Sequence, residues 1–290
     1  MKKSLGIYIH IPFCVRKCKY CDFLSGPVGK DVQEKYVEIL LCEIEQYKEV
    51  LKNSCTDTVF FGGGTPSILD GEDIARIMEK LYAAGNISET AEISIEANPG
   101  TVAEEKLLLW KKAGINRISF GLQSADNEEL KRLGRIHTWE EFEENYHLAR
   151  NCGFENINVD LMSALPGQTV KTWKKTMEKV VSLKPEHISA YSLIIEEGTP
   201  FYEAYTEHIQ SIRNCSRQRR KNVKCITKQK HFLLPKAMSD MKFPIMQNQE
   251  MNADIISLTG REWIIWDWDL AQPLFLEMYE KAIRRSFRNI

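Results

Sequence analysis

Three cysteines stand within eight residues near the start of the chain, and they constrain its fold and chemistry more than any other feature. Cys14, Cys18 and Cys21 form a CxxxCxxC run inside the segment GIYIHIPFCVRKCKYCDF. Three thiolates at this spacing can bind three irons of a [4Fe-4S] cluster and leave the fourth iron open. An open iron is what a cluster requires if it takes part in chemistry.

A structural zinc site is the main alternative for these cysteines. Such a site is closed by four ligands, usually as two separated pairs. Cys42, Cys55 and Cys152 stand alone, and Cys215 and Cys225 are ten residues apart. The opening MKKSLGIYIH holds an apolar stretch too short for a signal peptide or a membrane span, so disulfides are not expected. We therefore favour a cluster over zinc and predict a cytoplasmic protein without a transmembrane segment.

The composition narrows the class of protein without identifying a partner. The chain has 290 residues, of which 43% are hydrophobic, and its formal net charge is −1. These values are typical of a globular protein with one large or two modest domains. The balanced charge gives no support to a nucleic-acid or membrane-surface partner.

From Leu5 to about Ile195, short β-branched or aromatic runs alternate with longer amphipathic stretches, which is the pattern of successive βα units. Strands are predicted over Gly6–Ile11, Thr58–Phe61, Glu92–Ala97, Arg117–Leu122, Asn156–Leu161 and Ile188–Leu193. The six units predict an α/β fold with a partial parallel (β/α)6 barrel over residues 1–205.

Helices are predicted between these strands. Apolar residues recur at helical spacing from Val32 to Tyr47 and from Ile74 to Leu81. Three later helices are predicted over Glu104–Ala113, Thr138–Cys152 and Thr169–Leu183. Each apolar stripe is expected to face the sheet.

Parallel α/β sheets bind ligands at the carboxyl ends of their strands, so the residues that follow the predicted strands are the candidate site. The first strand leads into the cysteine loop, and the second leads into a triple glycine, which lets a ligand approach the backbone. The candidates at this rim are Gly63, Gly64, Thr65, Glu96, Gln123, Arg135 and Asp160. Together they can bind ribose hydroxyls, an ammonium group and a carboxylate. For any one of them, the alternative is a tight turn, a solvated loop residue or a helix cap.

These motifs resemble those of radical S-adenosylmethionine proteins of the oxygen-independent coproporphyrinogen III oxidase superfamily. The resemblance rests on YIHIPFC with CxxxCxxCDF, FFGGGTPS, EANPG, ISFGLQS, LxRxH and NVDLMSALPGQT. It covers residues 5 to about 203.

The resemblance implies a [4Fe-4S] cluster on Cys14, Cys18 and Cys21, with S-adenosyl-L-methionine bound to the open iron. Its implied contacts are Tyr8 and Tyr20 at the adenosyl group, Gly63, Gly64 and Thr65 at the methionine end, and Glu96, Gln123, Arg135 and Asp160 at the remaining polar groups. In proteins of this type, one electron from the cluster cleaves the sulfonium to methionine and a 5′-deoxyadenosyl radical.

The residues after the third cysteine distinguish two branches of that superfamily. CDF resembles the haem chaperone (HemW-like) branch, whereas the oxidases typically carry a fourth cysteine where this chain has Phe23. The resemblance therefore implies a haem chaperone that carries haem or a porphyrin, transfers haem to an acceptor protein and takes electrons from a donor. The alternatives are oxidative decarboxylation of coproporphyrinogen III and an inactive fragment.

After Tyr205 the alternation of strands and helices ends. A basic run extends from Arg213 to Lys230, and Trp263, Trp266 and Trp268 lie in REWIIWDWD. Basic residues beside aromatics can bind nucleic acid, but a charge run without periodicity is more typical of a solvated or disordered tail. We therefore predict an irregular tail over residues 206–290 and no nucleic-acid partner.

A shifted reading frame accounts for more of this tail. Translated from the third base of each codon, Met238–Phe275 permits a string that contains HNISYW, and its WDWD becomes GLG without any choice of bases. That string resembles the continuation of the family, including a motif associated with haem binding in the chaperone branch. We therefore predict that the segment is out of frame and that the haem-binding carboxyl-terminal part is missing.

Overall fold

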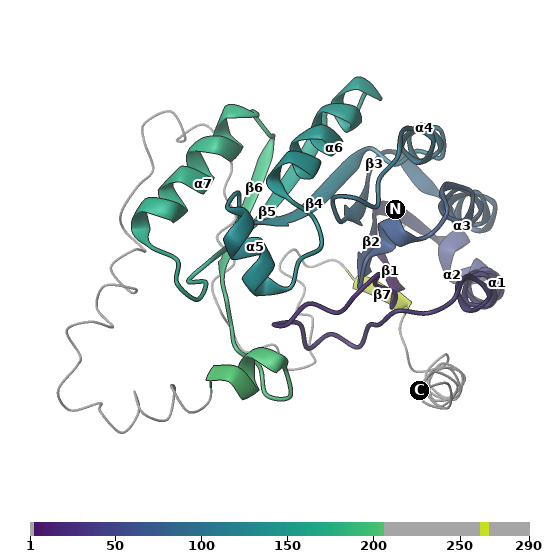
Figure 1. Cartoon of the computed structure of the whole chain (residues 1–290). Coiled ribbons are helices and arrows are strands. Elements are labelled where there is room, and N and C mark those ends of the chain that lie inside the picture. The colour runs from purple at the N-terminus through teal and green to yellow at the C-terminus, as the bar shows by residue number, and fades with distance from the viewer. Residues whose placement is uncertain (1–2, 206–261, 267–290) are drawn as a thin grey trace.

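The computed structural model describes residues 3–205 and the backbone of residues 262–266 (Figure 1). A single sheet runs through this part of the chain, in the order β6-β5-β4-β3-β2-β1-β7. Every neighbouring pair of strands is parallel. Apart from residues 262–266, the tail predicted to be out of frame lies outside the described residues.

All six predicted strands are confirmed, most of them longer than the sequence pattern indicates. They are β1 (Lys3–Ile11), β2 (Ser54–Gly63), β3 (Ile87–Ala97), β4 (Arg117–Gln123), β5 (Asn156–Ser163) and β6 (His187–Ser192). Consecutive strands are neighbours from β1 to β6, each joined to the next by a helical crossover. This order is that of a partial (β/α) barrel, as predicted.

A seventh strand, β7 (Glu262–Trp266), pairs with β1 in parallel. The sequence pattern predicts no strand after residue 205, so the sheet has one strand more than expected. The segment reads EWIIW, and aromatic and β-branched residues favour extended backbone. The outer edge of β1 offers unpaired backbone groups with which such a segment can pair.

The five predicted helices are confirmed as α1 (Lys30–Gln46), α3 (Gly71–Ala84), α4 (Glu104–Lys112), α6 (Trp139–Asn151) and α7 (Val170–Ser182). Three short elements were not predicted, namely α2 (Lys48–Asn53), the 3-10 turn η1 (Pro66–Ile68) and α5 (Asn127–Leu133). They are too short for a clear apolar period. Local hydrogen bonds define α5 instead, because the Asp126 side chain accepts from two backbone amides at its start and Gly134 ends it at φ 79°.

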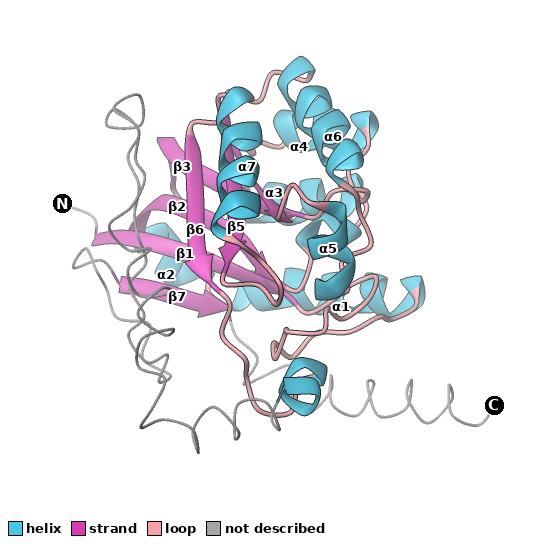
Figure 2. Ribbon diagram, turned by 60° about the vertical axis from the view of Figure 1, so that its left-hand side comes forward, coloured by secondary structure: helices cyan, strands magenta, loops and turns pink. Residues whose placement is uncertain are grey.

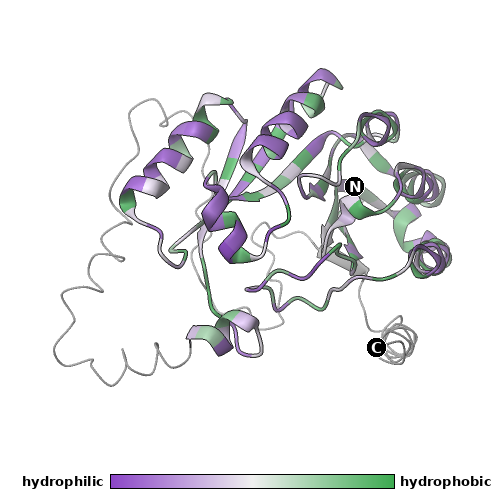
Figure 3. Ribbon diagram, viewed as in Figure 1, coloured by the Kyte–Doolittle hydropathy of each residue, from purple (hydrophilic) through white to green (hydrophobic). Residues whose placement is uncertain are grey.

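The helices lie along one face of the sheet and form an arc around it (Figures 1 and 2). Hydrophilic and hydrophobic residues alternate along α6 and α7, as expected for helices with one face toward the sheet (Figure 3). Within the described residues, no helix has the length and apolar character needed to cross a membrane.

The two faces of the sheet differ in chemistry. Ile7, Ile9 and Ile11 alternate along β1 and are at most 1% exposed in the core. Each such side chain contributes about 1.5–3 kcal/mol when fully buried. On the opposite face, Ser119 of β4 and Asp160 of β5 are joined by a hydrogen bond of 2.9 Å. The apolar face therefore stabilises the fold, and the opposite face of the sheet is polar near the carboxyl ends of the strands.

Candidate functional site

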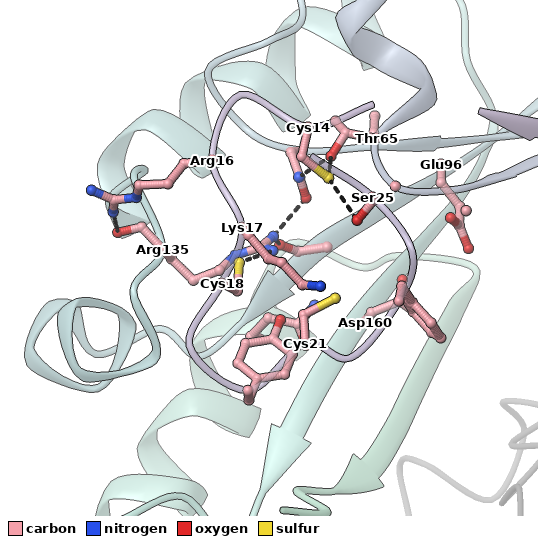
Figure 4. A pocket seen from close by; sticks show the side chains of 18 of the residues that line it. Cys14, Arg16, Lys17, Cys18, Cys21, Ser25, Thr65, Glu96, Arg135 and Asp160 are labelled. Atoms are coloured by element: carbon pink, nitrogen blue, oxygen red, sulfur yellow. Dashed lines mark hydrogen bonds between the residues drawn. The ribbon is translucent and has the colours of Figure 1, made fainter. Parts of the chain in front are cut away.

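A cavity lies at the carboxyl ends of the strands, between the loop after β1 and the ends of β2 to β6 (Figure 4). Of the predicted site residues, those that line it are Cys14, Cys18, Tyr20, Cys21, Gly63, Gly64, Thr65, Glu96, Gln123, Arg135 and Asp160. They come from segments that are as far apart in the sequence as Cys14 and Asp160. The parallel topology brings these residues together, because it places all strand ends on one side of the sheet.

The cysteine loop is held at its start and in its middle. Near its start, the Cys14 amide donates to the Gly26 carbonyl at 3.0 Å. In its middle, the Lys19 amide donates to the Leu133 carbonyl at the end of α5, at 3.1 Å. The Arg16 guanidinium donates to the neighbouring Gly134 carbonyl at 2.8 Å. The short helix α5, which the sequence did not indicate, therefore sets the position of this loop.

Cys14 is the most enclosed of the three cysteines, with 8% of its surface exposed. Its thiol donates to Ser25 Oγ at 3.4 Å and accepts from Thr65 Oγ1 at 3.5 Å. A Cβ added at Gly64 would lie 2.6 Å from the Phe13 carbonyl oxygen and 3.0 Å from Cys14 Sγ. Residue 64, just after β2, must therefore be glycine so that the backbone can pass beside the Cys14 thiol.

Cys18 and Cys21 lie further out in the same cavity (Figure 4). Arg135 Nη1 donates to Cys18 Sγ at 3.6 Å, so a positive charge faces this sulfur. Burial raises the pKa of the Cys21 thiol, and the nearby Cys18 and Cys14 thiols raise it further. A bound metal would overcome this effect, because coordination deprotonates a thiol.

The three thiols are a donor set that fits a [4Fe-4S] cluster. In the described part of the chain, no three His, Cys, Asp or Glu side chains converge as ligands of one metal ion must. In a [4Fe-4S] cluster each thiolate binds a different iron, so the sulfurs need not converge on one point. The three thiols and their common cavity therefore fit a [4Fe-4S] cluster.

Two carboxyl groups face the cavity from the ends of β3 and β5, the strands on either side of β4. Burial raises the pKa of Glu96 to about 8, and the nearby Asp160 carboxylate also raises it. Burial raises the pKa of Asp160 too, although hydrogen bonds from Ser119 at 2.9 Å and Asn158 at 2.8 Å oppose that rise. Such a pair favours a positively charged or hydroxyl-rich ligand, which would stabilise the ionised form of both groups.

Gln123 ends β4 in a strained backbone conformation. Its φ is 72°, which is unusual for a residue other than glycine, and the register of β4 with β5 shifts just before it. The Tyr191 hydroxyl donates to Gln123 Oε1 at 2.8 Å and holds the amide in the cavity. Tyr191 lies on β6 and lines the cavity. The sequence pattern did not indicate it, because only the fold shows that its hydroxyl reaches Gln123.

Other lining residues were also missed by sequence reasoning. They include Ser25, Asn98, Ser119 and Gly121. Asn98 could have been found, because it directly follows the end of β3 in the EANPG motif. Phe23, which follows the third cysteine by two positions, lies at the cavity and is 55% exposed.

Tyr8 is the predicted site residue that does not line this cavity. Its ring stacks with that of Phe60 at 6.0 Å between centroids, and its hydroxyl lies 3.2 Å from His10 Nδ1. Its contact with an adenosyl group stays a prediction. The buried His137 does not line the cavity either, and its Nε2 lies 3.3 Å from the Leu122 carbonyl oxygen. Burial and the nearby Arg135 lower the pKa of His137 to about 3.

Comparison with known proteins identifies the family. Residues 8–180 match the family profile described as the Radical SAM superfamily. This match covers more than half of the chain, and the chain belongs to the Radical SAM superfamily.

Individual relatives are similar over part of their length. The chain is 40% identical over 202 residues to the heme chaperone HemW of Haemophilus influenzae and 40% identical over 198 residues to the heme chaperone HemW of Escherichia coli. These matches cover 68% of this chain and 53% and 52% of those relatives. The chain therefore spans about half the length of the curated relatives it matches.

A solved structure supports the same fold. Coproporphyrinogen III oxidase (HemN) from Escherichia coli, described as a radical SAM enzyme, is similar with a TM-score of 0.63 and 26% identity. That similarity covers 72% of this chain and 53% of the oxidase chain.

Proposed function

We propose that the cavity binds a [4Fe-4S] cluster and S-adenosyl-L-methionine, and that the chain is the cofactor-binding part of a haem chaperone. The observation that carries this proposal is the common cavity of Cys14, Cys18, Cys21 and the polar strand ends. When bound, a cluster with an open iron supplies one electron to the sulfonium of S-adenosylmethionine.

The residues of the chain would hold these groups as follows. Cys14, Cys18 and Cys21 would bind three irons, and Gly64 would leave room beside Cys14. The Arg135 guanidinium, which faces the cavity, suits a carboxylate such as that of the methionine moiety.

Acidic groups, in contrast to the basic Arg135, lie on the other side of the cavity. The Glu96 and Asp160 carboxyl groups would accept hydrogen bonds from ribose hydroxyls or the ammonium group. Tyr20, Gln123, Gly63 and Thr65 would complete the contacts to the cofactor.

The haem chaperone role rests on the similarity to the two HemW proteins, which are named heme chaperones. By this proposal the partners are haem or a porphyrin, a haem-acceptor protein and an electron donor. We further propose a cytoplasmic location, because cluster thiols need a reducing compartment.

Iron content of the full chain tests the cluster. After anaerobic reconstitution we expect about four irons per chain, with loss of iron in Cys14→Ala and Cys18→Ala. Cys42, exposed on α1, supplies the matched control, and Cys42→Ala is expected to keep its iron. Equal iron content in Cys14→Ala and Cys42→Ala would refute the assignment.

The same preparation separates the three functions. Haem retention without porphyrinogen turnover is expected for the chaperone. Protoporphyrinogen formed with S-adenosylmethionine and a reductant would support the oxidase, to which the structural similarity with HemN points. A bound cluster with neither activity would support an inactive fragment, as the predicted loss of the haem-binding part implies.

A further inference from the structure

A continuous hydrogen-bond chain links two of the three cysteines across the rim of the cavity. Thr65 Oγ1 donates to Cys14 Sγ at 3.5 Å, and Asn98 Nδ2 donates to Thr65 Oγ1 at 2.9 Å. Arg135 Nη2 donates to Asn98 Oδ1 at 2.6 Å, and Arg135 Nη1 donates to Cys18 Sγ at 3.6 Å. Asn98 therefore stands at the centre of a path between the two sulfurs.

The direction of each hydrogen bond follows from the chemistry of these groups. A guanidinium can only donate, so the oxygen of the Asn98 amide must face Arg135 and its nitrogen must face Thr65. Because the Thr65 hydroxyl accepts from Asn98, its own hydrogen is available to point at Cys14. Both ends of the path therefore present a donor to a sulfur.

The backbone around Asn98 is held independently of its side chain. The Asn98 amide nitrogen donates to Ser67 Oγ at 3.1 Å, and Ser67 is fully buried. Thr101 Oγ1 donates to the Asn98 carbonyl at 2.6 Å. These contacts place the carboxamide at a defined position, where it can hold its two partners.

The neighbouring strand end leaves space for this arrangement. A Cβ added at Gly121 would lie 2.9 Å from both Asn98 Oδ1 and Arg135 Nη2. The Gly121 carbonyl also accepts a hydrogen bond from Arg135 Nη2. With Nη2 engaged by these two acceptors, the planar guanidinium is oriented so that Nη1 faces Cys18.

We propose that Asn98 is a positioning residue, which aims the Thr65 hydroxyl at Cys14 and the Arg135 guanidinium at Cys18 and thereby raises the reduction potential of the bound cluster. The inference rests on the proposed cluster at these cysteines. Hydrogen bonds to the sulfurs of an iron-sulfur cluster contribute to its potential. Donors stabilise the more negative, reduced form, so their loss lowers the potential.

The test is a redox titration of the reconstituted full chain, followed by the spectroscopic signal of the reduced cluster. Asn98→Ala is expected to shift the reduction equilibrium toward the oxidised form by about threefold to tenfold, where tenfold corresponds to about 59 mV for one electron. Asn145→Ala is the matched control, because the Asn145 amide oxygen accepts from the Gly100 amide of the same EANPG turn but its side chain does not line the cavity.

A second pair of variants tests the route through Thr65. Thr65→Val removes the hydroxyl and is expected to lower the potential, whereas Thr65→Ser keeps a hydroxyl and is expected to restore most of it. If Asn98 acts partly through Thr65, the effect of Asn98→Ala must be smaller in the Thr65→Val background than in the native chain. Thermal unfolding of each apo-variant shows which of them fold.

The outcomes separate this inference from the proposed function. An unchanged potential in Asn98→Ala with full iron content would overturn the role of Asn98 and leave the cluster in place. Additive effects in the double variant, or an equal shift in Asn145→Ala, would also overturn it. If Asn98→Ala does not fold, an unchanged potential in Thr65→Val alone overturns it. Absence of iron from the native chain would instead refute the proposed function.

Discussion

Arg135 Nη1 lies 3.6 Å from Cys18 Sγ, although 117 residues separate the two in the sequence. The contact forms because the cysteine loop is bound to the end of α5, directly before Arg135. The Lys19 amide donates to the Leu133 carbonyl, and Arg16 donates to the Gly134 carbonyl. Cys18 thus has a positively charged neighbour that comes from a distant segment of the chain, outside the cysteine motif.

Arg135→Lys is expected to weaken iron retention while keeping the charge. A lysine ammonium lacks the planar fork that reaches Cys18, Asn98 and Gly121 together. Loss of a contact to a metal-ligating residue typically costs about 10-fold or more in affinity. Iron release from the reconstituted chain to a chelator measures the effect.

Arg132→Lys is the control for this substitution, because Arg132 is exposed on α5, directly before the two residues whose carbonyls bind the cysteine loop. It is expected to release iron at the native rate. Equal release rates in the two variants would show that the fork of Arg135 is unimportant.

Gly64→Ala is expected to destabilise the apo-protein by about 1–3 kcal/mol, the usual cost of overpacking. The added methyl group would lie 2.6 Å from the Phe13 carbonyl oxygen, and that oxygen belongs to backbone that cannot easily move. It would also displace Cys14, so lower iron content is expected. Urea unfolding under anaerobic conditions and iron analysis measure the two effects.

Gly29→Ala provides the comparison for Gly64→Ala. At Gly29 the close neighbours of an added Cβ are atoms of the flexible Asp31 side chain. The free energy of unfolding is expected to change by less than about 1 kcal/mol there. A similar loss in both variants would contradict the role of the space beside Cys14.

The raised pKa of Glu96 predicts that the free energy of unfolding of the apo-protein depends on pH. Burial raises its pKa from 4.5 to about 8, so the folded chain binds this proton more tightly than the unfolded chain. The free energy of unfolding must therefore fall as the pH rises from 4.5 toward 8, by at most about 1.4 kcal/mol per pH unit from this group. Glu96→Gln is expected to reduce the slope of the unfolding free energy against pH. Part of this slope remains, because the pKa of Asp160 is also raised.

Urea unfolding of the apo-protein across that pH range measures the slope. Glu89→Gln, an exposed position on the same strand, is the control and is expected to leave the slope as it is. A native slope in Glu96→Gln would mean that the Glu96 carboxyl is ionised in the folded protein.

The reading frame after Tyr205 is tested on the coding DNA. We expect an insertion or deletion near this position, with an alternative frame that encodes the string containing HNISYW. A frame that continues without such a change, in several independent isolates of the DNA, would reject the hypothesis. The frame-restored protein is then expected to retain more haem than the present chain.

The barrel could be predicted from sequence because its units are local. Each strand is a short apolar run and each long helix carries its own apolar period, so α1 and α3 were recognisable without knowledge of their partners. Elements defined by a few hydrogen bonds were not recognisable. α5 depends on its Asp126 cap, and β7 depends on a free edge of β1 that exists only in the assembled sheet.

The sequence by itself determined which atoms are available for the site. Three thiols at fixed spacing, glycines after β2 and polar residues after later strands follow from covalent order and from the rule that strand ends bind ligands. The tertiary structure decided which of them meet, since contact across more than a hundred residues depends on parallel register and loop anchoring. It placed Tyr8 outside the cavity, brought Arg135 to Cys18, and put Asn98 between Thr65 and Arg135.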